Sequence, residues 1–218
     1  MKYLDVPQSG SRAATTYSRN RYGQYARNRS SPVNPNTSFQ GIVRARMTLN
    51  AAAWRALTSV QRAGWSALGA QMSRTDSLGQ VYTLNGFGAY CSVNNNKLAA
   101  GDAAVSDPPA LVTPAGLVTA TITLTAAAFS IAYTVTPLAA GSRLFAFLSP
   151  QQNAGRSFCG DVRLVAVSAA AAASPLNVFS AYQSRLGTPV VGNRVFFSLQ
   201  VYNSGFLSGP MVGSQVVS

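Results

Sequence analysis

The chain has 218 residues, of which 17 are Lys or Arg and five are acidic, so its formal net charge is +12 at pH 7. All five acidic residues are aspartates, and the chain contains neither glutamate nor histidine. General acid–base catalysis draws mostly on His and paired carboxylates, and zinc sites need several Cys, His or carboxylate ligands. We therefore expect no enzyme, no metal, no cofactor and no small-molecule substrate.

The remaining global features predict a soluble protein made in the cytoplasm. No stretch reaches the roughly 18 uncharged apolar residues that a membrane span requires, and no apolar core of a signal peptide follows the N-terminus. Cys91 and Cys159 lie in segments of different character without metal-ligand spacing. We expect two buried free thiols, because disulfides are rare in cytoplasmic proteins.

Residues 1–36 predict an extended basic arm that becomes ordered against a partner. Residues 1–47 hold eight basic residues against one acidic residue, and residues 7–36 show no helical or strand period. Such a segment buries too little apolar area to offset its ordering entropy, yet tyrosines are interleaved with the arginines along it, and both are enriched at interface hot spots. The predicted partner-binding residues are Tyr17, Arg19, Arg21, Tyr22, Tyr25, Arg27, Arg29, Arg44 and Arg46.

Residues 37–106 predict a small helical region. Thr37 with Gln40 and Thr58 with Gln61 have the spacing of capping boxes, and each precedes an approximate helical stripe of apolar residues. Pro32 and Pro35 should hold the chain before the first helix extended. We expect Trp54 and Trp65 to pack between the helices, residues 77–80 to form a turn before an extended segment at 81–84, and a third helix to run from Asn85–Gly86 to Gly101.

Residues 107–116 predict a linker, because Asp107-Pro108-Pro109 cannot continue a helix. Over residues 117–218 apolar and polar residues alternate, which is typical of half-buried strands. One helix should interrupt them, with Ser174 as its cap, Pro175 in its first turn and Gly187 after its end. Strands are expected at 118–124, 129–135, 143–148, 161–167, 194–202 and 211–217. Together these patterns predict an α+β chain whose C-terminal part is an antiparallel β-sandwich of the fibronectin/immunoglobulin kind.

Nucleic-acid binding is the first alternative that the charge suggests. The helix after Thr58 starts with Gln61, Arg62, Ala63, Gly64 and Trp65, too few polar groups for a helix that reads bases. Non-specific contact of the arm with phosphates stays open. The single Gly-x-Gly at residues 86–88 lacks the context of a phosphate-binding loop.

Two stretches resemble a group of tailed-bacteriophage and prophage proteins of similar length. The resemblance rests on Asn20-Arg21-Tyr22-Gly23, Arg27-Asn28-Arg29, Pro32 to Thr37, Ala53 to Thr58 and Gln61 to Trp65, and in the C-terminal half on Gly155 to Phe158, Arg163-Leu164, Ser174-Pro175-Leu176 and Arg185-Leu186-Gly187. It implies a virion-associated protein with a fibronectin-like C-terminal half and carries no catalytic residues.

These patterns favour a virion structural protein, such as a capsid-decoration, neck or tail-attached subunit. It would dock on other virion proteins through its arm and occur as a homo-oligomer or in many copies in a lattice. A DNA-associated packaging protein and a sandwich-type adhesin or carbohydrate-binding module are the alternatives.

Overall fold

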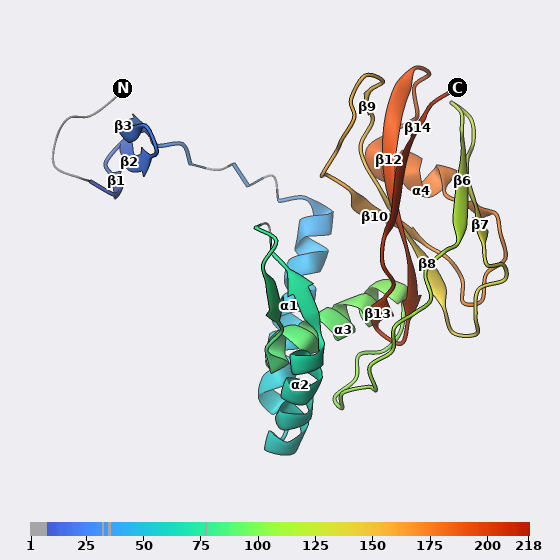
Figure 1. The fold of residues 1–218 in the computed structure, drawn as a ribbon, viewed down its shortest axis with the longest axis horizontal. Coiled ribbons are helices and arrows are strands. Elements are labelled where there is room, and N and C mark those ends of the chain that lie inside the picture. Colours follow the sequence, from blue (N-terminus) through green and yellow to red (C-terminus); the bar gives the residue numbers. More distant parts are fainter. Residues whose placement is uncertain (1–7, 32, 35, 77) are drawn as a thin grey trace. The chain divides into compact units, whose positions relative to one another are not determined.

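The computed structural model describes residues 8–31, 33–34, 36–76 and 78–218, and Figure 1 shows its elements. It is a mixed α+β fold, and all of the strand pairs found in the described residues are antiparallel. The chain divides into two compact units, Met1–Arg44 and Ala45–Ser218. They are called the first and second unit below, and each is described by itself.

The first unit contains a three-stranded sheet where an extended arm was expected. Its strands are β1 (Gly10–Arg12), β2 (Thr15–Asn20) and β3 (Gly23–Asn28), in the order β1-β2-β3. Asn20 favours the turn between β2 and β3, because its side chain accepts a hydrogen bond from the Tyr22 N–H at 2.9 Å. The expectation of an arm that does not pair with itself was therefore wrong for residues 10–28. These strands consist almost entirely of polar residues, Gly and Tyr, and a search for apolar alternation cannot detect such strands.

Three helices follow at the places the capping residues predict: α1 (Ser38–Ala56), α2 (Ser59–Gln71) and α3 (Gly86–Ala100). Both capping boxes are confirmed, since the side chain and backbone of Thr37 bond to Gln40, and those of Thr58 to Gln61. Asn85 caps α3, and Gly101 ends it in the left-handed conformation at φ 84°. Pro32, Pro35 and Ser77 lie outside the described residues.

Aromatic side chains form the core of the helical region. Trp65 is fully buried and meets the ring of Tyr90 edge-on at 5.1 Å between centroids, while Trp54 packs on Phe87 and Tyr90. The packing predicted for both tryptophans is confirmed. The hairpin of β4 (Ser73–Thr75) and β5 (Val81–Thr83) joins α2 to α3, and only its second strand was expected.

The C-terminal region contains two further antiparallel sheets. One has the order β11-β7-β6. The other runs β10-β8-β12-β13, and β14 and β9 also pair with β12. The strands are β6 (Thr119–Leu124), β7 (Phe129–Thr134), β8 (Arg143–Leu148), β9 (Gln152–Asn153), β10 (Arg163–Val167), β11 (Leu176–Asn177), β12 (Asn193–Asn203), β13 (Phe206–Leu207) and β14 (Met211–Val216). Alternate side chains of β6, β7, β8 and β12 fill one shared core. The six predicted strands are all present, as β6, β7, β8, β10, β12 and β14.

The helix in this region, α4 (Phe179–Leu186), begins later than predicted. Ser174 does not cap it, because the Ser174 hydroxyl accepts a hydrogen bond from the Tyr133 N–H at 3.0 Å. Leu176 and Asn177 pair with β7 as β11 instead. The predicted end at Gly187 is confirmed.

The segment predicted as a linker is held against α2. The Trp65 indole N–H donates to the Ser106 carbonyl at 2.7 Å, and Gln61 donates to Asp107 at 3.0 Å. Pro108 lies so close to Gly64 that a Cβ there would come within 3.0 Å of its ring. Phe206 of β13 also belongs to the helical core, so the helical region and the sheets of residues 45–218 form one unit.

Candidate interaction surfaces

Seven of the nine predicted binding residues lie on or beside the small sheet of the first unit. Tyr17 and Arg19 are in β2, Tyr25 and Arg27 are in β3, and Arg21, Tyr22 and Arg29 directly follow these strands. Arg44 and Arg46 are instead in α1. The structure therefore brings seven of the nine together on one element.

The strand register distributes these seven residues over both faces of the sheet. Tyr17 is opposite Ala26, and Tyr25 is opposite Ser18. Because opposed residues share a face and successive residues alternate, Tyr17 and Arg19 are on one face. Tyr25 and Arg27 are on the other. The two tyrosines cannot anchor the same flat partner surface.

The turn between β2 and β3 presents the most exposed aromatic residue of the sheet. The Arg21 guanidinium lies 5.2 Å from the centroid of the Tyr22 ring. Both residues are exposed. A cation over an aromatic face is worth about 0.5–1 kcal/mol at an exposed position, so this pair orders the tip weakly and leaves it accessible.

Arg44 has an intramolecular role in the first unit. Its guanidinium donates to the side-chain oxygen of Asn34 at 3.0 Å and to that of Asn36 at 3.3 Å. These bonds tie the segment before α1 to the second turn of the helix. Arg46, half-buried, is in the second unit.

The electrostatics of the first unit are one-sided. Residues 8–44 contain six arginines and no acidic residue. Among the described residues of this range none is buried, so the sheet has no apolar core of its own. Its exposed guanidinium groups suit carboxylate or phosphate partners, which arginine binds in a bidentate geometry.

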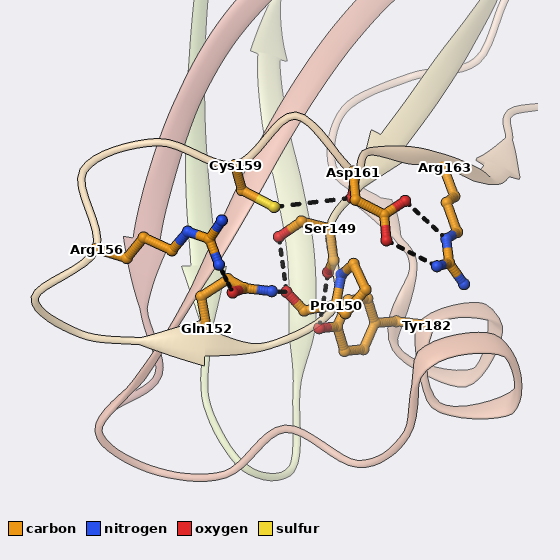
Figure 2. A network of polar contacts seen from close by, with 8 residues as sticks. All are labelled: Ser149, Pro150, Gln152, Arg156, Cys159, Asp161, Arg163 and Tyr182. Carbon is orange, nitrogen blue, oxygen red and sulfur yellow. Dashed lines mark hydrogen bonds and ion pairs between the residues drawn. The ribbon is translucent and has the colours of Figure 1, made fainter. Parts of the chain in front are cut away.

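A second surface was not predicted: the loop of residues 154–162, which presents Phe158, a residue that is 74% exposed. Figure 2 shows some of the polar contacts in and beside this loop, among them the one between Arg156 and Gln152. Arg156 donates to the Gln152 side chain at 2.6 Å and to the Phe158 carbonyl at 2.8 Å. Arg194 of β12 donates to the Arg156 carbonyl at 3.0 Å.

Beside Phe158 lies a groove of about 410 Å³ on the sheet of β12 and β14. Its walls are apolar or hydroxyl-bearing, and Phe196, Val212 and Val162 form much of it. Cys159 is buried next to it, and Cys91 is buried in the helical core, so the expected free thiols are confirmed. Burial raises the pKa of the Cys91 thiol, which keeps it protonated. The sequence signal that could have indicated this surface is a single aromatic residue, Phe158, within the otherwise polar or small residues Gly155–Gly160.

Tyr182 of α4 lies near this loop, and its ionisation predicts how the stability of the core depends on pH. Its hydroxyl donates to the Ser149 carbonyl at 3.1 Å (Figure 2), and burial raises the pKa of Tyr182 to about 12. Because the unfolded-state pKa is near 10, the contribution of the neutral phenol is complete below about pH 10 and is lost as the pH rises through 12. We expect urea midpoints to fall between pH 9 and pH 11.5.

The matched variant is Tyr182→Phe, which cannot ionise at this position. At pH 7 it should lose about 1 kcal/mol with the hydrogen bond, and its midpoint should fall less steeply above pH 10. Some fall should persist, because burial also raises the pKa of Tyr133 and of Tyr90. Equal slopes in the two proteins would contradict the assignment.

Metal and membrane sites receive no support from the described residues. Among them, no group of three Cys, His or acidic residues is placed to hold a metal ion. No helix in this part of the chain is long and apolar enough to span a membrane.

Comparisons with protein-family models and with curated proteins found no match. No protein-family model matches the chain, and no curated protein shows significant similarity to it. The surfaces described above therefore provide the basis for a functional hypothesis.

Proposed function

We propose that the chain is a structural protein of a tailed-bacteriophage particle that docks on neighbouring subunits through its first unit. It would be made in the host cytoplasm and incorporated into the virion as a decoration, neck or tail-attached subunit, in many copies. The sheets of residues 117–218 would form a fibronectin-like sandwich that projects from the lattice or contacts other copies. The observation that supports this role best is the arginine-rich sheet without a core of its own.

The energetics of that sheet favour a partner. A small sheet needs an apolar face packed on something else to be independently stable, and the described residues of the first unit include no buried side chain. Ordering each backbone residue costs about 1–2 kcal/mol. Partner surfaces on the two faces would supply the missing burial, one through Tyr17 and the other through Tyr25, and acidic groups would pair with the arginines.

The direct test is attachment to particles of the phage that encodes the chain. Deletion of residues 1–36 should reduce the amount of protein that co-sediments with purified particles at least tenfold. The second unit should keep its melting temperature, because its core lies outside the deleted residues. Unchanged attachment after the deletion would contradict the proposal.

The six arginines of residues 8–44 also support a second candidate, a packaging protein that binds DNA phosphates. In that case the logarithm of the binding constant should fall with the logarithm of salt concentration, with a slope near −5 for about six phosphate contacts. Most of the slope should vanish with residues 1–36, which hold five of the six arginines. Weak DNA binding at physiological salt, together with attachment to DNA-free particles, would favour the structural role.

A further inference from the structure

Strand β3 is an open edge of the small sheet. It pairs with β2 and, among the described residues, with no other strand. The two-residue turn after Asn20 makes Asn20 and Gly23 the first bonded pair, so Gly23, Tyr25 and Arg27 direct their backbone groups to β2. The backbone groups of the intervening residues, such as Ala26 and Asn28, are directed outward.

The same strand carries a row of large side chains on one face. The Arg29 N–H donates to the Ala14 carbonyl at 2.7 Å, which extends the ladder one residue beyond β3. Tyr25, Arg27 and Arg29 are therefore at alternate positions, about 6.8 Å apart along the strand. Both arginines are exposed, and in the described part of the chain no hydrogen bond or ion pair involves either guanidinium group.

We propose that the outer edge of β3 receives an extended acidic segment of a neighbouring virion protein, which adds a fourth strand to the sheet. This inference rests on the proposed function and specifies the partner chemistry. Backbone hydrogen bonds would supply affinity, as in other cases of strand addition. Carboxylates at alternate positions of the added strand would face Arg27 and Arg29 across cross-strand distances of about 5 Å.

Charge complementarity selects an acidic occupant, because residues 8–44 contain six arginines and no acidic side chain. The edge itself favours a peptide over a nucleic acid. An edge strand exposes C=O groups as well as N–H groups, and a phosphate backbone offers acceptors but no donors for those carbonyls. An extended peptide satisfies both.

The test uses the full chain and a labelled nine-residue peptide that alternates Glu with Thr, followed by fluorescence anisotropy. A matched peptide with a methyl group on every backbone nitrogen keeps the charge but has no N–H group on either edge that could pair with β3. We expect the first peptide to bind and the methylated one to bind at least tenfold more weakly. Arg27→Gln and Arg29→Gln should each weaken binding about tenfold, the effect of losing one charge-assisted hydrogen bond.

Arg12→Gln is the control, because Arg12 is outside the predicted binding set and the change removes the same charge from the opposite face of the same sheet. It should change peptide affinity less than threefold. No binding, equal binding of both peptides, or an equal loss with Arg12→Gln would overturn the proposal. So would an oligonucleotide that binds more tightly than the peptide at physiological salt through Arg27 and Arg29.

Particle attachment of the same variants separates this inference from the proposed function. Deletion of residues 1–36 could abolish attachment while the double variant Arg27→Gln and Arg29→Gln has no effect. That result supports the structural role and contradicts the proposal that the edge of β3 binds an acidic segment. If the chain binds the peptide but does not attach to particles, the proposed binding at the edge of β3 is supported and the structural role is contradicted.

Discussion

Replacement of Trp65 by alanine should lower the free energy of unfolding of the second unit by about 3–5 kcal/mol, the range for truncation of a large buried aromatic residue. Trp65 has no exposed surface and contacts the Tyr90 ring. Its indole N–H also holds the Ser106 carbonyl at 2.7 Å. The variant therefore loses packing between α2 and α3 and releases the segment that follows α3. Urea denaturation followed by circular dichroism measures the change.

Val60→Ala is the control for this variant. Val60 is in the same helix, but 79% of it is exposed, so its loss should change stability by less than about 0.5 kcal/mol. If Trp65→Ala costs no more than Val60→Ala, the helical core described here is wrong.

The helices could be predicted because their ends are encoded locally. Thr58 with Gln61, Asn85 and Gly101 each satisfy backbone groups within four residues of themselves. The strands of residues 117–218 could be predicted because one of their faces is buried, which produces apolar alternation.

The small sheet of the first unit could not be predicted in the same way, because neither of its faces is buried. Its register depends on the Asn20–Gly23 turn rather than on an apolar pattern. The binding residues were therefore placed on the right segment, but their division between two faces required the structure. Tyr17 and Tyr25, eight residues apart, would share a face on one continuous strand, and only the intervening turn and register separate them.

The loop that presents Phe158 was missed for a different reason. Its shape depends on Arg156, on Gln152 and on Arg194, which is 38 residues further along the chain. The start of α4 was also predicted wrongly because of a distant contact: the Ser174 hydroxyl bonds to Tyr133, 41 residues away, and does not cap the helix. Local signals identify where elements can begin, but long-range hydrogen bonds decide which of those signals are used.

The joint between the helices and the sheets should depend on Asp102, which directly follows the glycine that ends α3. One carboxylate oxygen accepts a hydrogen bond from the Tyr202 hydroxyl at 2.5 Å, and the other pairs with Arg143 at 3.1 Å. Burial, assisted by the bond to Asp102, raises the pKa of Tyr202. Asp102→Ala would leave this buried hydroxyl and the Arg143 guanidinium without their partner.

We expect Asp102→Ala to cost about 3 kcal/mol in urea denaturation, near the lower end of the range for breaking a buried ion pair, because its carboxylate is one-third exposed. Asp102→Asn keeps an acceptor for Tyr202 and should cost less. Asp161→Ala is the matched control, since Asp161 pairs with Arg163 at 2.7 Å but is 56% exposed. An exposed pair is worth about 0–1 kcal/mol. Equal losses for Asp102→Ala and Asp161→Ala would mean that the charge itself, rather than the joint between α3, β8 and β12, stabilises the second unit.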